Sequence, residues 1–400
     1  MKLQGKALVA AMCVGQIGNL LPHVAVPAVM AQHLMPQWHL SATEAGMMAS
    51  SFAFGYMVAV PVLTTLTDRI DARRILIIGS ALSGLATLGF GFFAHDLLSA
   101  ILWWTLAGIG FAGAYMPGLK ALTDRMGPGD SSRSVTLYTS SFSFGVGISF
   151  LVAQLAADML GWRWAFFLTG VGPVLMLLAC WAMEPVTLTP TTAPLLDFRP
   201  VLRNRSALGY ILGYGLHCFE LYGMRTWIVA FWTFVVAHNG GAAPLGPLAV
   251  SVLVSLMAFP ASIIGNELAL KHGRHRAISW VMLASAATGL LIGFLAGASP
   301  WILLVLLAIY SFTVPADSGA LTSGMTTSAA PSQRGATMAV HSTVGFGLSA
   351  VGAWAMGAAI DLAGGPGAQS GWLAGFALMA CSIALGPFVL RWSRRAGRQS

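Results

Sequence analysis

The chain has 400 residues, of which 56% are hydrophobic and only 8% are charged. Soluble globular domains usually carry about 25% charged residues, so this composition excludes an ordinary soluble fold and indicates a protein that lies largely within a lipid bilayer. The net charge of +8 does not indicate nucleic-acid binding, because the basic residues come in twos and threes in short segments and do not gather on one domain.

Apolar segments long enough to cross a membrane recur along the whole chain. A helix needs about 20 residues to span a hydrocarbon core of about 30 Å. By this criterion the sequence predicts an all-α membrane protein with twelve transmembrane helices, over residues 7–31, 44–67, 74–94, 97–122, 134–158, 162–183, 207–236, 246–270, 276–298, 301–327, 335–360 and 371–391.

The basic residues give the orientation of these spans. Apart from Arg163 and Arg225, every Lys and Arg lies in or beside every second gap between spans, which is the asymmetry that marks cytoplasmic loops. An even number of spans places both termini on one side, and Lys2, Lys6 and the arginines from Arg391 to Arg398 indicate that this side is the cytoplasm. We therefore expect a multi-pass protein of the bacterial cytoplasmic (inner) membrane with both termini in the cytoplasm.

The remaining compositional signals argue against enzymatic chemistry. The four cysteines all lie within predicted spans, with neither a disulfide pattern nor the spacing of a metal site. No G-x-x-x-x-G-K-[ST] loop is present, so ATP is not expected as an energy source. We expect no metal, no cofactor and no enzymatic activity.

A polar, proline-rich segment over residues 184–206 divides the spans into six and six. It separates a predicted N-terminal bundle, 1–183, from a C-terminal bundle, 207–400, and is expected to be a cytoplasmic linker. The two halves repeat short phrases at an offset of about 200 residues, such as Ala-Leu-Thr at 121–123 and 320–322. Two six-helix repeats related by an axis along the membrane normal are the plan of one large class of transporters.

The segment Thr64 to Arg74 reads T-T-L-T-D-R-I-D-A-R-R, and residues 161–166 read G-W-R-W-A-F. These phrases, with twelve spans and a central linker, resemble the major facilitator superfamily over essentially the whole chain. The first phrase is similar to the signature G-x-x-x-D-R-x-G-R-R, although Thr64 and Asp71 stand where glycines are usual. The resemblance implies a secondary transporter that works by alternating access, in which the matching loop residues Asp68, Arg69, Arg73 and Arg74 act in gating.

Two predicted spans carry polar stripes with the same i, i+3, i+7 spacing, which places each stripe on one helix face. The stripes consist of Gln16, Asn19 and His23 in the first span and of His217, Glu220 and Met224 in the seventh. Polar groups that faced lipid at this depth would be costly, so these faces are expected to line a substrate cavity between the halves. The alternative is that they form hydrogen bonds to neighbouring helices.

Glu220 is the best candidate for proton coupling, because a carboxyl group at mid-membrane can carry a proton and His217, one turn away, could share it. Asp317 is either a second protonation site or the ion partner of Lys120. Arg225 lies five residues beyond Glu220, on another face of the helix. Either Gly223 allows a bend that brings the pair together, or Arg225 contacts another helix or an anionic substrate.

Aromatic residues in the fourth and tenth spans, including Trp104, Tyr115 and Tyr310, could stack on a substrate or pack within the bundle. Trp104 stands where proton-driven members of the superfamily often carry an arginine. The proline-containing glycine motif of many antiporters is also missing from residues 145–150. Both departures argue against a drug/proton antiporter.

These observations favour a proton-coupled transporter of a small, anionic organic solute. The alternative is proton-driven efflux of drugs or metabolites. A receptor or assembly factor on the same scaffold would need a larger surface outside the membrane than these short loops offer. The expected partners are a small-molecule substrate, protons and the lipid bilayer, and we expect a monomer.

Overall fold

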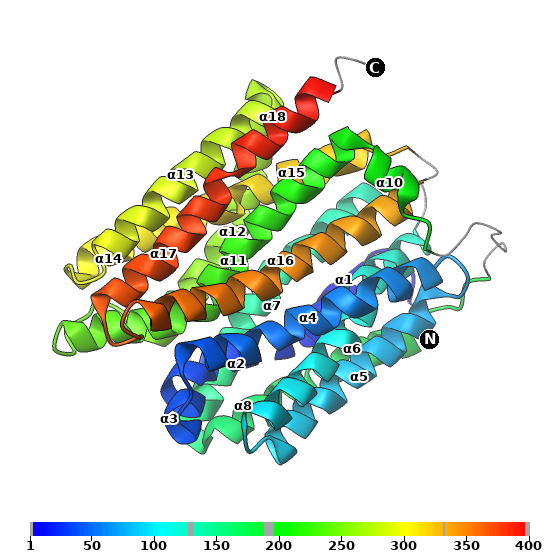
Figure 1. Ribbon diagram of the computed structural model, residues 1–400. Coiled ribbons are helices and arrows are strands. Elements are labelled where there is room, and N and C mark those ends of the chain that lie inside the picture. Colours follow the sequence, from blue (N-terminus) through cyan, green and yellow to red (C-terminus); the bar gives the residue numbers. More distant parts are fainter. Residues whose placement is uncertain (1–2, 127–130, 188–195, 331–332, 397–400) are drawn as a thin grey trace. The chain divides into compact units, whose positions relative to one another are not determined.

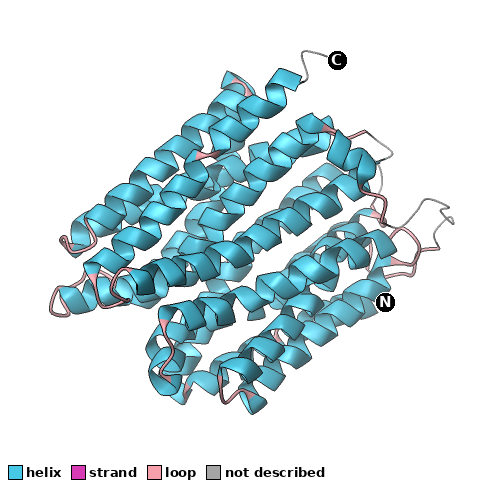
Figure 2. Cartoon of the chain, in the orientation of Figure 1, coloured by secondary structure: helices cyan, strands magenta, loops and turns pink. Residues whose placement is uncertain are grey.

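The computed structural model describes residues 3–126, 131–187, 196–330 and 333–396. These residues form helices joined by short loops, and they contain no strand (Figures 1 and 2). The predicted all-α fold class is therefore confirmed. Lys2 and Arg398, which contributed to the predicted orientation, lie outside the described residues.

The first half of the chain forms nine α-helices and two short irregular turns in its described part. They are α1 (Gly5–Leu20), η1 (Pro22–Val24), α2 (Ala25–Val29), η2 (Met30–Leu34), α3 (Met35–Trp38), α4 (Ala42–Leu66), α5 (Ala72–Phe93), α6 (Leu97–Thr123), α7 (Ser131–Leu160), α8 (Trp162–Val171) and α9 (Val174–Trp181).

The described part of the second half begins with a short helix and continues with longer ones. They are α10 (Arg199–Arg203), α11 (Arg205–His238), α12 (Pro247–His272), α13 (Arg274–Phe294), α14 (Pro300–Thr313), η3 (Val314–Asp317), α15 (Ser318–Ser328), α16 (Arg334–Leu362), α17 (Gln369–Ala384) and α18 (Gly386–Ala396).

Within the described residues, 11 helical stretches are long and apolar enough to cross a membrane. The predicted seventh span corresponds to α11, which has 34 residues and is therefore long enough as well. It is less apolar than the others because it contains His217, Glu220 and Arg225. With α11, each of the predicted spans corresponds to a helical stretch.

The first span extends beyond its predicted end at residue 31. The chain continues as a broken helix to Trp38, with a 3₁₀ turn at Pro22–Val24 and a π-helical turn at Met30–Leu34. Prolines inside the stretch remove backbone donors, which explains why the helix is interrupted. It ends where His39 adopts a left-handed conformation with φ 51°.

The helices form two compact units. Unit 1 comprises residues 1–29 and 51–197, and unit 2 comprises residues 30–50 and 198–400. Within unit 2, the carboxylate of Asp361 accepts hydrogen bonds from the backbone N–H groups of Ala42, at 3.0 Å, and Thr43, at 2.6 Å. These bonds satisfy free donors at the start of α4 and hold residues 30–50 against α16.

Close helix packing in unit 1 depends on glycines. A Cβ atom at Gly110 of α6 would overlap the backbone of Ser83 on α5 and would lie 2.8 Å from the carbonyl oxygen of Gly79. The two helices can therefore approach until their backbones are in contact, as small residues allow in membrane bundles.

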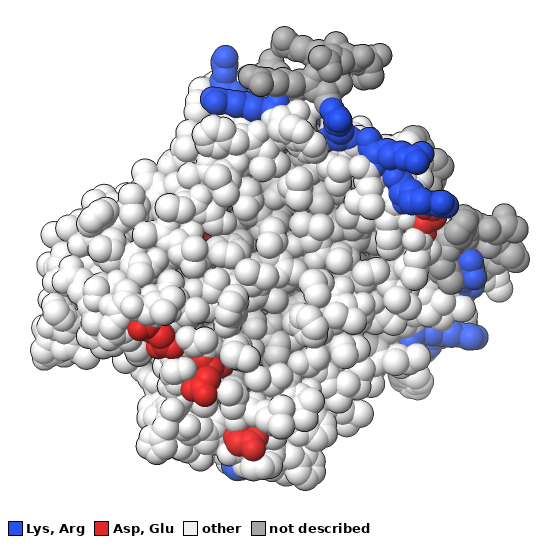
Figure 3. All heavy atoms as spheres, viewed as in Figure 1, with Lys and Arg blue, Asp and Glu red and all other residues white. Residues whose placement is uncertain are grey.

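Charge is distributed unevenly along the helices of unit 2. On the face shown in Figure 3, Lys and Arg atoms gather near the ends of α18 and around α10, whereas acidic atoms lie towards the opposite helix ends. The basic loops of this unit thus gather at one end of its helices, as the alternation of basic loops along the sequence predicts.

We predict that Gly110→Ala destabilises the protein by about 1–3 kcal/mol, because the added methyl group forces α5 and α6 apart. Gly367→Ala is the matched control, since a Cβ atom at Gly367 would meet nothing within 4 Å. Thermal unfolding of the purified proteins in detergent, followed by tryptophan fluorescence, measures the difference. Equal transition temperatures for the two variants would contradict this account of the packing.

Candidate functional site

Helix α11 brings several ionisable side chains into the interior of unit 2. Glu220 is 1% exposed, His217 is 2% exposed and Arg225 is 8% exposed. The helix can lie close to α16 because Gly352 faces the backbone of Phe219, where a Cβ atom would overlap the Phe219 carbonyl oxygen. Groups of this kind are costly to bury unless they have partners, so their surroundings indicate what they can do.

The carboxyl group of Glu220 is bonded on one oxygen only. Its Oε1 accepts hydrogen bonds from Ser285 Oγ on α13, at 2.8 Å, and from Tyr310 Oη on α14, at 3.0 Å. Its Oε2 is buried and has no hydrogen-bond partner in the described part of the chain. A buried carboxylate with one bare oxygen would be strongly disfavoured, whereas a carboxyl group with a hydrogen on Oε2 fits these contacts.

A second buried pair joins α11 to η3, one turn from Glu220 along α11. His217 Nδ1 forms a hydrogen bond with the carbonyl oxygen of Val314 at 3.1 Å and lies 2.7 Å from Asp317 Oδ1, which has no hydrogen-bond partner among the described residues. Both neighbours are acceptors, so Nδ1 carries a hydrogen. Asp317 ends the 3₁₀ turn η3, which packs closely on α12 because Gly265 has no side chain to meet Ala316.

The sequence left two roles open for Asp317, as the ion partner of Lys120 or as a second protonation site. In the structure its neighbour is His217. Lys120 has its own acidic neighbours within unit 1, with Nζ 3.1 Å from Asp124 Oδ1 and 4.0 Å from Asp68 Oδ1. The His217–Asp317 pair can share a proton, which is the other role considered for this aspartate.

Arg225 lies over an aromatic ring of its own helix. Its guanidinium carbon is 5.2 Å from the centroid of the Tyr222 ring. Helix α11 continues without a break through Gly223, so residues 220 and 225 leave the helix about 140° apart. The bend that would bring Glu220 to Arg225 is absent. Met224, between them, is also buried.

The polar stripe of α1 and η1 is buried within unit 1. Gln16 Oε1 accepts a hydrogen bond from Tyr138 Oη at 2.8 Å. Asn19 is 1% exposed, and neither its Oδ1 nor its Nδ2 has a hydrogen-bond partner among the described residues. His23 lies among three phenylalanine rings, with centroid distances of 5.3 Å to Phe52, 5.2 Å to Phe111 and 5.4 Å to Phe142.

The three candidate aromatic residues have different surroundings. Trp104 is fully buried and contacts the rings of Phe52 and Phe166. Tyr115 stacks on Phe111 with centroids 6.1 Å apart. Both environments favour the packing role that was left open for these residues. Tyr310 differs, because it donates to Glu220 and so belongs to the polar cluster of unit 2.

In the loop between α4 and α5, the ionic contacts centre on Asp71. Its two carboxylate oxygens accept hydrogen bonds from Arg125 Nη2 at 2.9 and 2.8 Å. Oδ1 also caps α5 by accepting from the N–H of Arg73, and Oδ2 accepts from the N–H of Val186. Asp71 thus joins α5 to the segments that follow α6 and α9.

The candidate gating residues make fewer contacts. The side chain of Asp68 is 56% exposed, and the ionic contact it makes among the described residues is the one with Lys120 at 4.0 Å. Arg73 Nε donates to the carbonyl oxygen of Cys180 at 2.8 Å, and Arg69 and Arg74 are exposed. Sequence matching missed Asp71 and Arg125, although an aspartate directly before Ala72-Arg73-Arg74 is a typical helix N-cap.

The contacts of Asp71 also set its protonation. Burial acts to raise the pKa of this carboxyl group, but hydrogen bonds from Val186, Arg125 and Arg73 and the charge of Arg125 outweigh burial and lower the pKa. A carboxylate whose pKa is lowered by folding stabilises the folded protein at pH values above the pKa that the group has in the unfolded chain. This contribution is lost as the pH falls through the folded pKa.

A bundle of long apolar helices with buried acids, histidines and an arginine defines a polytopic membrane transporter. The family model of the Major Facilitator Superfamily matches residues 12–353, and the chain belongs to this superfamily. Members of this superfamily are membrane transporters and not enzymes. The resemblance drawn from the sequence motifs is confirmed.

Individual relatives are more distant. Protein spinster homolog 1 of Homo sapiens is 25% identical over 238 residues, which cover 56% of this chain and 45% of the relative. D-galactonate transporter of Escherichia coli O6:H1 is 30% identical over 165 residues, covering 40% of this chain and 38% of the relative. The chain thus spans less than half the length of these curated relatives.

The fold also matches solved structures. A bacterial homolog of the human lysosomal transporter Spinster, in an inward-facing and occupied conformation, superposes with a TM-score of 0.72 at 14% identity. The match covers 96% of this chain and 94% of that one. At this identity the likeness supports the fold alone.

We predict that Asp71→Asn lowers the stability of the protein by about 3 kcal/mol at neutral pH, because it leaves the buried guanidinium of Arg125 without its counter-charge. Asp68→Asn, which alters an exposed group, should cost less than about 1 kcal/mol. Thermal unfolding at neutral and acidic pH measures both effects. Because the pKa of Asp71 is lowered, the difference between wild type and Asp71→Asn should shrink in acid, and a difference that grows in acid would contradict this assignment.

Proposed function

We propose that the protein is a proton-coupled transporter of a small organic anion, acting by alternating access as a monomer in the bacterial cytoplasmic membrane with both termini in the cytoplasm. The observation that carries this proposal is the environment of Glu220. Two hydroxyl groups bind Oε1, while Oε2 is enclosed and without a hydrogen-bond partner among the described residues. Such a group is suited to carry a proton while it is enclosed and to release it when water enters.

The proposed proton path includes the His217–Asp317 pair. His217 lies one helical turn from Glu220, and its Nδ1 is held between Asp317 and the Val314 carbonyl oxygen. The carbonyl oxygen accepts a hydrogen bond, so this arrangement places a hydrogen on Nδ1. We propose that Glu220 is the principal carrier and that the pair modulates its exchange with water.

The proposed anion contact is Arg225. A guanidinium group presents paired donors that match a carboxylate, and burial strengthens such an interaction. The name of the Escherichia coli relative, D-galactonate transporter, supports the same substrate class for this chain, because galactonate is a small hydrophilic carboxylate. We propose that Gln16, Asn19 and His23 contribute polar contacts to the substrate from unit 1.

A second candidate is the transport of amphipathic molecules, including efflux of drugs or metabolites. It is favoured by an Arabidopsis thaliana relative named probable sphingolipid transporter spinster homolog 1, which is 21% identical over 149 residues. The phenylalanine rings around His23 would suit an apolar substrate portion. The loop with Asp68, Arg69, Arg73 and Arg74 would act in gating under either proposal.

We predict that Glu220→Gln abolishes substrate accumulation driven by a pH gradient while substrate exchange continues. The amide can still accept hydrogen bonds from Ser285 and Tyr310, but it cannot release a proton. Uptake into proteoliposomes, with and without an imposed pH gradient, measures both activities. Glu267→Gln is the matched control, because Glu267 is exposed on α12. Gradient-driven accumulation that survives Glu220→Gln would refute the coupling role.

We also predict that Arg225→Ala weakens binding of anionic substrates about 10- to 100-fold, the range expected for loss of a hydrogen bond between charged partners. Neutral analogues, such as galactose beside galactonate, should be affected much less. Thermal stabilisation by each compound measures the change, with Arg276→Ala as a control at an exposed cation. Equal losses for charged and neutral compounds would show that Arg225 acts through structure and not through anion contact.

A further inference from the structure

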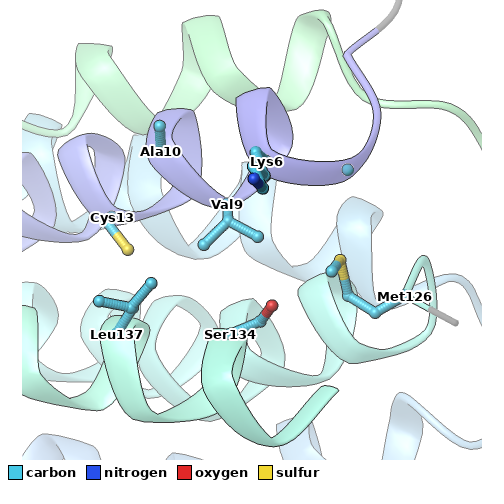
Figure 4. Close-up of a pocket in the computed structure, with 8 residues that line it drawn as sticks. Lys6, Val9, Ala10, Cys13, Met126, Ser134 and Leu137 are labelled. Carbon is cyan, nitrogen blue, oxygen red and sulfur yellow. The ribbon is translucent and has the colours of Figure 1, made fainter. Parts of the chain in front are cut away.

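Unit 1 contains a cavity that is separate from the polar stripe of α1. It has a volume of about 460 Å³, within the range of about 300–1,000 Å³ that is usual for ligand pockets. It lies between α1, the first turns of α7 and the segment that follows α6 (Figure 4). Its lining includes Lys6, Val9, Ala10, Cys13, Met126 and Leu137.

The chemical character of the cavity changes along α1. Of the described residues that line it, Lys6 is charged, Ser134 carries a hydroxyl group, and most of the others are apolar. Figure 4 shows the sulfur of Cys13 directed across the gap towards Leu137, and Val9 facing the part of α7 that carries Ser134. Lys6 and Cys13 are seven residues apart on one helix, which corresponds to a rise of about 10 Å. The cavity therefore has a cationic end, at the helix terminus, and an apolar end.

We propose that this cavity binds a single-chain amphipathic anion, namely a fatty carboxylate. Its carboxylate would lie against the ammonium group of Lys6, and its hydrocarbon chain would pass Val9 towards Cys13 and Leu137. This binding site is independent of Glu220 and Arg225, so the proposal does not rest on the transport function proposed above.

The two ends of the cavity together select this ligand class. A small hydrophilic anion would bring one charge to Lys6 but would fill apolar space with polar groups, which is unfavourable. A neutral hydrocarbon would fill the apolar end and leave the charge of Lys6 unused. A fatty carboxylate matches both ends, because burial of each methylene group contributes to binding and the charges are complementary.

Cys13 provides a direct test, because it is partly exposed and lines the cavity. The full chain, with Cys180, Cys218 and Cys381 replaced by alanine, is placed in phosphatidylcholine nanodiscs. The rate at which N-ethylmaleimide labels Cys13 is then measured with hexanoate, octanoate and decanoate. Binding is expected to slow labelling, and the apparent affinity should rise about fourfold for each added methylene group.

Two substitutions distinguish binding in the cavity from general effects of the ligand on the bilayer. Lys6→Gln should weaken protection by decanoate about threefold, as expected for loss of an exposed ion pair, without affecting protection by methyl decanoate. Lys271→Gln, at an exposed cation of unit 2, is its control. Leu137→Ala should weaken protection by both compounds, whereas Leu102→Ala, an exposed leucine outside the cavity lining, should not.

Three results would overturn the proposal. In the first, no carboxylate slows the labelling of Cys13. In the second, the carboxylates slow labelling, but the effect does not depend on their chain length or is the same for wild type and Lys6→Gln. The third is protection by phosphatidylglycerol in the nanodisc without added carboxylate, which would identify a two-chain membrane lipid as the occupant. Lys6→Gln alters only an exposed side chain, so loss of folding does not complicate the comparison.

Discussion

A polar group inside a membrane-spanning bundle is costly unless it finds a partner within the protein, because the hydrocarbon core supplies no water. This constraint explains why the ionisable residues of α11 lie buried against groups from other helices. The Glu220 carboxyl group is bonded by hydroxyl groups from α13 and α14, and His217 is bonded by the carbonyl oxygen of Val314 in η3, with Asp317 beside it. The same constraint requires close helix contacts, which Gly352 and Gly265 permit beside these residues.

The helices and the polar stripes could be predicted because both depend on local patterns. Apolar length locates a span, and i, i+3, i+7 spacing locates a face, so α11 and its buried residues follow from the sequence. The partners of these residues could not be predicted in this way. Ser285 and Tyr310 are 65 and 90 residues from Glu220, and nothing in their local sequence marks them as its donors. The breaks near Pro22 and Met30 follow from prolines within the stretch, which a count of apolar residues does not register.

The loop between α4 and α5 shows where motif matching is insufficient. The family signature directed attention to Asp68, yet Asp68 is exposed, whereas Asp71 binds Arg125 through both carboxylate oxygens. A signature aligns positions, but an ion pair depends on which side chain faces inward when the loop folds. Asp71 is directed inward because it also caps α5, and capping fixes its side chain beside the segments that follow α6 and α9.

The two halves share a repeat, but their equivalent helices carry different chemistry. The stripe of α1 and η1 is neutral or aromatic in its contacts, whereas α11 carries an acid, a histidine and an arginine. Under the proposed function, proton carriage and anion recognition therefore reside on one helix of unit 2.

Glu220 and Arg225 leave that helix about 140° apart, so they cannot be coupled by direct contact in this structure. Coupling would instead require α11 to move as a rigid element. A movement that exposes Glu220 to water would then also change the surroundings of Arg225. The uninterrupted helix through Gly223 makes such a rigid movement physically reasonable.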